Sequence, residues 1–292
     1  MDVSTGTGRP ARGRAFALVM VVVAMALLGA VAAANAAAAN YTALGDSYAA
    51  GPLIPNQSLN PLGCLRSDRN YAHLTAAAKG LALTDVSCSG ATTVDMTQAQ
   101  NVEPGPANPP QFNGLSAATN VVSVTIGGND IGFTEIIEHC ITYNPFSTPC
   151  KNQYDPGGHD LLAERIAVAA PKVAAVLQGI HAHAPNARVF VVNYPDILPT
   201  GSGCWPTVPL AFGDVPFLHA TEEHLNQMLA SEAAANNATV VDWYSASVGH
   251  DACKSSSARW VEPLIPSELT APVHPTKAGM AGAAAALEAA IG

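Results

Sequence analysis

The stretch YTALGDSY, residues 41–48, joins a predicted β-strand to a predicted helix start and places Ser47 at the turn between them. Tyr41 to Leu44 form a short apolar run of the kind found in buried strands. Open parallel sheets bind ligands at the carboxyl ends of their strands, so Ser47 would stand where such a sheet holds a substrate. A serine is a strong nucleophile only when a base takes its proton, so the chain must also supply a histidine.

Two further blocks carry residues that suit acyl-transfer chemistry. His274 stands at a predicted helix start near the C-terminus, which would hold its imidazole at the loop edge of the sheet. The stretch GGND, residues 127–130, follows the third predicted strand, and its glycines permit a tight turn that aims Asn129 into the cleft. The Asn129 amide and the backbone N–H groups of Ser47 and Gly90 would stabilise an oxyanion.

These three blocks, in this order, resemble the GDSL esterase and lipase family, also called SGNH hydrolases. The resemblance implies that the catalytic residues are Ser47, Gly90, Asn129 and His274. It implies hydrolysis of carboxylic esters through an acyl-enzyme on Ser47, with His274 as the base and with no cofactor or metal. The pair His181 and His183 does not predict a metal site, because their alternating spacing on a helix end makes the two rings diverge.

The chain departs from the family at one position. The family often has an aspartate three residues before the histidine, and here that position is Ala271. A backbone carbonyl can orient the imidazole in place of a carboxylate. We therefore expect a Ser-His dyad oriented by the carbonyl of Ala271 or Pro272, with Glu262 or Glu268 as the alternative.

Short apolar runs alternate with longer helical stretches, which indicates parallel strands joined by crossover helices. We predict a three-layer α/β/α sandwich, with a central parallel sheet of about five strands in flavodoxin-like order. The predicted strands are 41–44, 83–87, 121–126, 189–193 and 240–243. The predicted helices are 71–79, 161–183, 219–236 and 275–290, with Pro275 in the first turn of the last and with Pro171 kinking or ending the second.

The N-terminus has the three-part pattern of a secretory signal peptide. Arg9, Arg12 and Arg14 precede an apolar run from residue 15 to residue 34, and small residues follow it. We expect cleavage after residue 36 or 39, so that residues 1–36 are the signal and residues 37–292 form one secreted hydrolase domain. The alternative is an uncleaved anchor, because about 20 apolar residues can span a bilayer.

Composition restricts the partners and the compartment. The formal net charge of −9 does not suit binding to nucleic acid or anionic lipid headgroups. Charged residues make up 12% of the chain, against about 25% in typical proteins, so we expect disulfides to contribute more stability than surface ion pairs. Spacing alone does not choose among the possible pairings. The resemblance implies sequential pairing: Cys64 with Cys88, Cys140 with Cys150 and Cys204 with Cys253.

The sequence leaves the substrate open among phospholipids, triacylglycerols, soluble esters and acetylated polysaccharides. We expect a monomer that acts on lipid or fatty-acyl esters, with a polysaccharide O-deacetylase as the alternative. The absent aspartate also leaves open a secreted binding protein without turnover. Apolar loop residues would either suit an acyl chain or cover the core edges: Leu53, Ile54, Phe112, Phe146, Trp205 and Phe212.

Overall fold

A five-stranded parallel sheet forms the centre of the fold in the computed structural model, which describes residues 1–6 and 38–292. Its strand order is β2-β1-β3-β4-β5, the order of flavodoxin-like folds. The strands are β1 (Asn40–Gly45), β2 (Ala82–Asp85), β3 (Thr119–Thr125), β4 (Arg188–Val192) and β5 (Thr239–Val241). The predicted fold class, strand number and order are confirmed.

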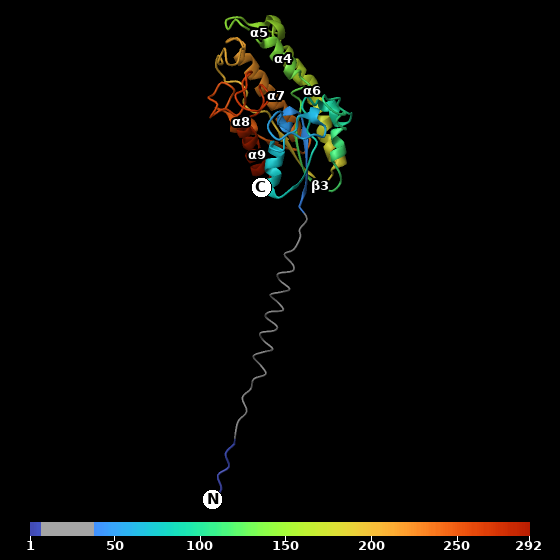
Figure 1. Ribbon diagram of the computed structural model, residues 1–292. Coiled ribbons are helices and arrows are strands. Elements are labelled where there is room, and N and C mark those ends of the chain that lie inside the picture. The colour runs from blue at the N-terminus through green and yellow to red at the C-terminus, as the bar shows by residue number, and fades with distance from the viewer. Residues whose placement is uncertain (7–37) are drawn as a thin grey trace. The chain divides into compact units, whose positions relative to one another are not determined.

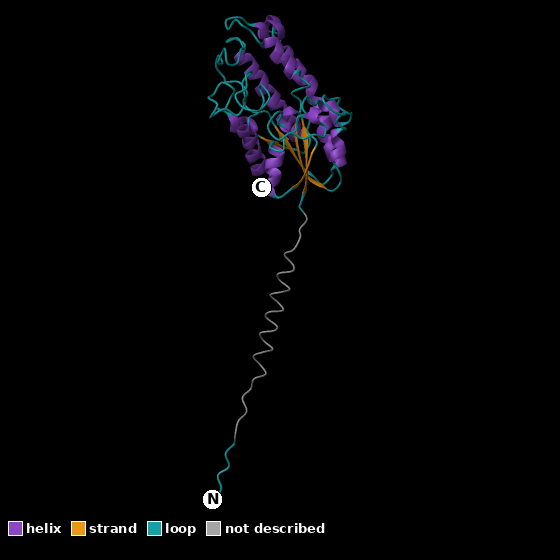
Figure 2. Ribbon diagram, in the orientation of Figure 1, coloured by secondary structure: helices purple, strands orange, loops and turns teal. Residues whose placement is uncertain are grey.

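Helices cover both faces of the sheet (Figures 1 and 2). On one side, α3 packs against α9, which also contacts α8, while on the other α6 packs against α7. Their bounds are α3 (Tyr71–Lys79), α6 (Leu161–His183), α7 (Val215–Ala235), α8 (Trp243–Ser247) and α9 (Lys277–Ile291). Because helices cover both faces, β3 and β4 are buried along nearly their whole length.

The predicted helices 71–79 and 161–183 are confirmed residue for residue. One detail of the helix predictions was wrong, because Pro275 lies outside α9, whose N-cap is Thr276. Of the two alternatives for Pro171, an end of the helix is excluded, since α6 continues through this residue. Thr276 accepts a hydrogen bond from the Gly279 N–H, so the cap falls one residue after the proline.

Two short helices occupy segments for which the sequence predicts no helix, and a third, α2 (Ser47–Ala50), begins at the predicted helix start beside Ser47. The other two are α4 (Phe133–Cys140) and α5 (Pro149–Tyr154). Each is too short to show a clear helical repeat of apolar residues. Tyr154 at the end of α5 is fully buried, so tertiary packing holds this short helix in place.

Three disulfides cross-link the domain: Cys64–Cys88, Cys140–Cys150 and Cys204–Cys253. The sequential pairing is confirmed. The second disulfide joins α4 to α5, and the third joins the loop after β4 to the loop after α8. Each contributes on the order of 2–4 kcal/mol by restricting the unfolded chain. The cross-links therefore stabilise the loops at the carboxyl edge of the sheet.

In the part of the chain that the structure describes, none of the helices combines the length and the apolar character needed to cross a bilayer. The predicted signal peptide falls largely on residues 7–37, outside the described residues.

Candidate active site

Ser47 lies directly after β1, as the first residue of α2. Asp46 is the N-cap of this helix and accepts a hydrogen bond from the Tyr48 N–H. Gly45 before it has φ +138°, and a Cβ at this position would lie 2.5 Å from the Thr125 carbonyl oxygen. Glycine is therefore required for β1 to turn into α2 so close to β3. This turn places Ser47 at the carboxyl edge of the sheet.

His274 meets Ser47 from the opposite end of the chain. Its Nε2 lies 2.8 Å from Ser47 Oγ, and its Nδ1 lies 2.7 Å from the Pro272 carbonyl oxygen. Because a carbonyl only accepts, Nδ1 carries the proton and donates it to Pro272. Nε2 is then unprotonated and accepts the hydrogen bond from the Ser47 hydroxyl.

A backbone carbonyl holds the imidazole where the family often has an aspartate. Of the two carbonyls expected from the sequence, that of Pro272 makes the contact. The alternative carboxylate Glu262 is occupied elsewhere, because it pairs with Arg259 at 2.9 Å and accepts the Ser267 N–H at 2.7 Å. Between Pro272 and His274, Val273 takes a φ of +59°, which turns the chain back toward the ring. This conformation is uncommon for a β-branched residue and occurs beside the reacting groups.

Tyr48 connects the serine segment with the histidine segment. Its hydroxyl donates to the Val273 carbonyl at 2.6 Å, and its ring lies 5.1 Å from the His274 ring, centroid to centroid. Burial lowers the pKa of His274, and the hydrogen bond to Pro272 partly offsets this. The base is therefore neutral at pH 7.

Asn129 and Gly90 lie on neighbouring loops at the same edge. Asn129 Nδ2 donates to the Ala91 carbonyl at 2.9 Å, which leaves its second N–H available for a ligand. Gly90 has φ +78°, a left-handed conformation that glycine adopts without strain. Among the described residues, the backbone N–H groups of Ser47 and Gly90 have no hydrogen-bond acceptor. The structure thus joins Ser47 to His274 directly and joins Asn129 to the residue that follows Gly90. The loops that carry Ser47, Gly90 and Asn129 follow the parallel strands β1, β2 and β3.

A buried tyrosine joins the serine loop to the GGND loop. The Tyr194 hydroxyl donates to Asp46 Oδ2 at 2.5 Å and accepts the Gly128 N–H at 2.8 Å. Burial raises the pKa of Asp46 to about 7, although the hydrogen bonds from Tyr194 and Tyr48 lower it. The sequence analysis did not select Tyr194, because none of the residues next to it in the sequence indicates a role in the site.

Asp130 ties the GGND loop to the loop that carries Gly90. Its carboxylate accepts hydrogen bonds from the Thr93 N–H at 3.0 Å and the Thr93 hydroxyl at 2.5 Å. The partner of Asp130 therefore lies in a different loop from its own turn. The contact fixes the position of the loop that carries Asn129 relative to the loop that carries Gly90.

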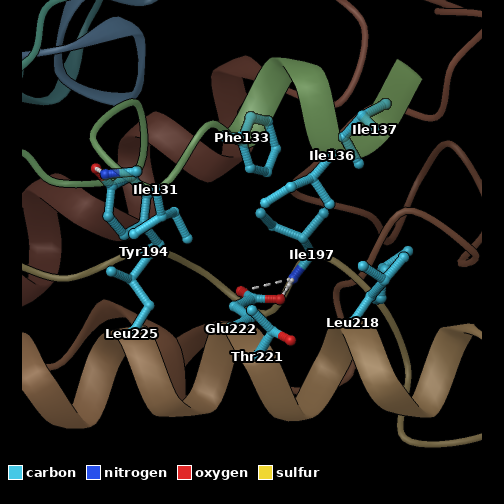
Figure 3. A pocket seen from close by; sticks show the side chains of 12 residues that line it. Ile131, Phe133, Ile136, Ile137, Tyr194, Ile197, Leu218, Thr221, Glu222 and Leu225 are labelled. Atoms are coloured by element: carbon cyan, nitrogen blue, oxygen red, sulfur yellow. Dashed lines mark hydrogen bonds between the residues drawn. The ribbon is translucent and has the colours of Figure 1, made fainter. Parts of the chain in front are cut away.

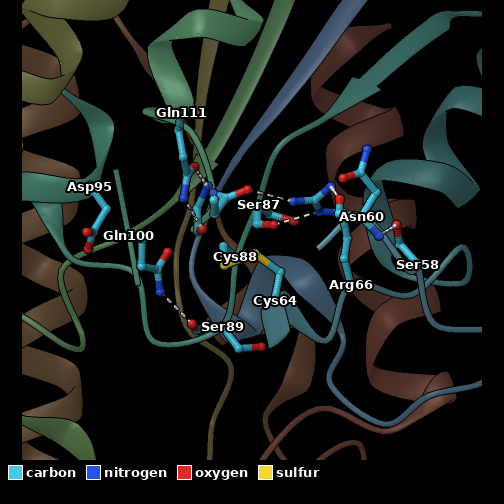
Figure 4. The surroundings of a disulfide bond; sticks show 12 residues. Ser58, Asn60, Cys64, Arg66, Ser87, Cys88, Ser89, Asp95, Gln100 and Gln111 are labelled. Atoms are coloured by element: carbon cyan, nitrogen blue, oxygen red, sulfur yellow. Dashed lines mark hydrogen bonds between the residues drawn. A yellow bond between two sulfur atoms is a disulfide. The ribbon is translucent and has the colours of Figure 1, made fainter. Parts of the chain in front are cut away.

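The Cys64–Cys88 disulfide anchors the chain two residues before Gly90, and Figure 4 shows it beside Ser89. The Ser89 N–H donates to the Cys64 carbonyl, and Gln100 donates to the Ser89 carbonyl at 2.8 Å. Gln111 makes two hydrogen bonds to the backbone of Gly45, to its N–H and its carbonyl. Covalent and hydrogen bonds therefore fix the backbone on both sides of the Ser47 hydroxyl.

The fold, and a serine paired with a histidine at the carboxyl edge of its sheet, define a three-layer α/β/α ester hydrolase. The chain belongs to the GDSL-like lipase/acylhydrolase family, whose sequence model matches residues 43–281. The resemblance noted from the sequence is confirmed, and the protein is a carboxylic ester hydrolase.

Named relatives come from Streptomyces. The chain is 42% identical over 248 residues to Lipase 2 of Streptomyces coelicolor, covering 82% of this chain and 81% of the relative. Its structure is similar to that of an extracellular lipase from Streptomyces rimosus, with a TM-score of 0.70 and 28% identity, covering 87% of this chain and 100% of the lipase. It is also similar to phospholipase A1 from Streptomyces albidoflavus NA297, with a TM-score of 0.68 and 28% identity, covering 87% and 99% of the two chains.

Proposed function

We propose that the protein is an exported lipase or esterase that hydrolyses fatty-acyl esters, with Ser47 as the nucleophile and His274 as the general base. The observation that carries this proposal is the 2.8 Å contact between Ser47 Oγ and His274 Nε2. This distance lies within the range that direct proton transfer to a general base requires. The Pro272 carbonyl supports the same assignment, because it holds the tautomer in which Nε2 accepts.

The reaction proceeds in two halves. Ser47 Oγ attacks the ester carbonyl carbon while its proton passes to His274 Nε2, and the oxyanion receives hydrogen bonds from Asn129 and from the Ser47 and Gly90 N–H groups. The imidazolium then gives its proton to the leaving alcohol, and an acyl-enzyme remains. Water, deprotonated by His274, attacks the acyl carbon, and the proton returns to Ser47 Oγ as the carboxylic acid leaves.

An apolar pocket beside the Asn129 loop supports a fatty-acyl substrate (Figure 3). It lies between α4 and α7. Two of its lining residues, Tyr194 and Phe133, contact Tyr48, the residue that follows Ser47. Their rings pack edge-on against the Tyr48 ring, with centroid distances of 5.1 and 5.9 Å. The apolar lining residues are Ile131, Phe133, Ile136, Ile137, Ile197, Leu198, Leu218 and Leu225.

The apolar loop residues expected to suit an acyl chain do not line this pocket. Ile54 and Phe112 are 0% and 7% exposed and belong to the core, so for these two residues the alternative of a packing role is confirmed. Leu53 and Phe146 are exposed, at 47% and 84%. The pocket instead uses side chains of α4, a helix that the sequence does not predict.

Export of the protein as a monomer after cleavage of residues 1–36 is part of the proposal. Three disulfides and no free cysteine favour an oxidising compartment. The similar lipase of Streptomyces rimosus is extracellular, which supports export of this protein as well. The similar phospholipase A1 makes phospholipid the second substrate to test after simple esters.

The proposal is tested by the rate of p-nitrophenyl ester hydrolysis from acetyl to palmitoyl, measured on mature protein. We expect the maximum at medium or long chains, because the pocket is apolar. Activity on acetyl esters alone, with release of acetate from an acetylated polysaccharide, would contradict the fatty-acyl assignment and favour the deacetylase.

The pH profile is expected to follow His274. Only neutral imidazole accepts the Ser47 proton, and burial lowers the pKa of this ring from its ordinary value of 6.5. The value of kcat/KM should therefore stay level above pH 6.5 and fall as the pH drops through a pKa below 6.5. Asp46 has a pKa of about 7, so its titration would appear at a higher pH than that of His274, and the two can be told apart in the profile. A single inflection above pH 7 would contradict the assignment of His274.

The Leu218→Trp substitution is expected to shorten the acyl preference. Leu218 is 7% exposed and lines the pocket from α7, so the larger ring fills space that the chain would use. The ratio of decanoyl to butyryl ester hydrolysis should fall at least about tenfold, since each buried CH₂ contributes about 0.8 kcal/mol. Val168→Trp, on the exposed surface of α6, is the matched control. An unchanged ratio in Leu218→Trp would place the acyl chain elsewhere.

A further inference from the structure

Three buried ionisable side chains meet between α7 and the loop after β4, outside the contact between Ser47 and His274. Asp196 lies on the loop, and His219 and Glu222 project from one face of α7, three residues apart. His219 Nδ1 is 3.6 Å from Asp196 Oδ1. One donor atom from each of the three lies within 4.8 Å of the other two. Their exposed fractions are 5%, 6% and 9%.

One oxygen of this cluster has no hydrogen bond. Asp196 Oδ1 is buried and has no partner among the described residues, although it faces the imidazole of His219. The Nδ1 proton of His219 goes instead to the Leu198 carbonyl, at 2.7 Å. A buried carboxylate oxygen without a donor destabilises a fold unless a cation or another group compensates it.

The surrounding positive charges compensate the cluster only in part, because Lys254 and His219 favour the charged form of Asp196 while Asp251 disfavours it. Lys254 pairs with Asp251 at 3.1 Å, and this buried aspartate adds negative charge beside Asp196. Glu223, from the next position of α7, also faces His219, at 3.7 Å. The nearby Tyr244 hydroxyl is neutral and donates to Glu223.

The Glu222 side chain contacts the loop after β4 and also lines the apolar pocket. Both of its oxygens accept the Ile197 N–H, at 3.1 and 3.2 Å, and its side chain also lines the apolar pocket (Figure 3). Its donors are backbone N–H groups of the same loop, which leave part of the acceptor capacity of its two oxygens unused. The cluster therefore contains two carboxylates, from Asp196 and Glu222, and one imidazole, from His219.

We propose that Asp196, His219 and Glu222 bind a divalent cation of the zinc type, which ties the loop after β4 to α7. One imidazole nitrogen with carboxylate oxygens is a donor set that Zn²⁺ accepts, whereas Ca²⁺ and Mg²⁺ prefer oxygen ligands alone. The Leu198 carbonyl, beside His219 Nδ1, is available as a fourth donor. On binding, the Nδ1 proton passes to solvent and the three donor atoms draw together around the ion.

Such a site would be structural and independent of the ester chemistry. The cation would stabilise one wall of the apolar pocket, because Glu222 and Ile197 belong to that wall. A ligand that binds only the folded chain raises the unfolding midpoint with increasing ligand concentration. Stability, rather than activity, is therefore the readout.

The test uses the mature chain, stripped with EDTA and then titrated with Zn²⁺, followed by calorimetry and by thermal unfolding. We expect one Zn²⁺ per chain and an unfolding midpoint that rises by several degrees. Asp196→Asn and His219→Gln should each weaken Zn²⁺ binding at least about tenfold. His224→Gln, an exposed histidine on the same helix, should bind as the wild type does.

Three results would overturn the proposal. The first is absence of Zn²⁺ binding by the wild-type chain, which does not depend on whether any variant folds. The second is a Zn²⁺ response that persists in His219→Gln and Glu222→Gln or is lost in His224→Gln. The third is stabilisation by Ca²⁺ and not by Zn²⁺, which would assign the site to an oxygen-binding cation.

Discussion

Replacing Ser47 with alanine is expected to lower kcat/KM for p-nitrophenyl butyrate by about 10⁴-fold or more. Ser47 Oγ is the group that His274 Nε2 contacts, at 2.8 Å, and no other hydroxyl contacts that nitrogen among the described residues. Alanine leaves no oxygen to form the acyl-enzyme, so only the oxyanion donors and substrate binding remain. The measurement is the steady-state rate of purified mature protein.

The fold should survive this substitution, since Ser47 contributes one hydrogen bond of about 1 kcal/mol. The unfolding midpoint should therefore stay within a few degrees of the wild type. Ser231→Ala, an exposed serine on α7, is the matched control and should keep full activity. Residual activity above a tenth of the wild-type rate in folded Ser47→Ala would mean that another group is the nucleophile.

Replacing Asn129 with alanine is expected to lower kcat by about 10² to 10³-fold while KM changes little. One N–H of its amide already binds the Ala91 carbonyl, so the second is the donor that an oxyanion would use. A donor that acts mainly in the transition state lowers kcat when it is removed, and the magnitude follows oxyanion donors generally. Steady-state kinetics on a soluble ester separate the two constants.

A control is needed because Asn129 also ties two loops together. Thr93→Val removes the hydroxyl contact to Asp130 between the same two loops without touching any oxyanion donor. This variant should lose stability but less than tenfold in kcat. If Thr93→Val lost as much kcat as Asn129→Ala, the role of Asn129 would be to hold the loops and not to donate to the oxyanion.

Much of the fold was predictable because its signals are local. The runs that became β3 and β4 are apolar along most of their length, since helices cover both faces of the sheet. Helix α3 begins at an asparagine cap and ends at a glycine, so its bounds are encoded in adjacent residues. Helix α7 extends four residues before its predicted start, because Val215 and Leu218 are buried by tertiary contacts.

The candidate residues of the site were predictable for a related reason. Gly45 and Gly90 have positive φ, and such backbone requirements restrict the residue type at that position alone. For the group that orients His274, the sequence favoured the carbonyls of Ala271 and Pro272 and left the carboxylates of Glu262 and Glu268 as alternatives. The choice of Pro272 goes with the left-handed φ of Val273, whose carbonyl accepts from Tyr48 and whose N–H donates to the Glu262 carbonyl.

Short apolar runs in the sequence by themselves predicted the parallel α/β/α architecture, and the resemblance to the GDSL family implied the family and the candidate residues Ser47, Gly90, Asn129 and His274. Only the tertiary structure decided which distant side chains meet. The hydroxyl of Tyr194 reaches Asp46 across 148 positions, and Asp196 faces His219 and Glu222 from another element. Such contacts follow from the strand order, which brings the carboxyl ends of β1, β3 and β4 to one edge, and no local pattern encodes them.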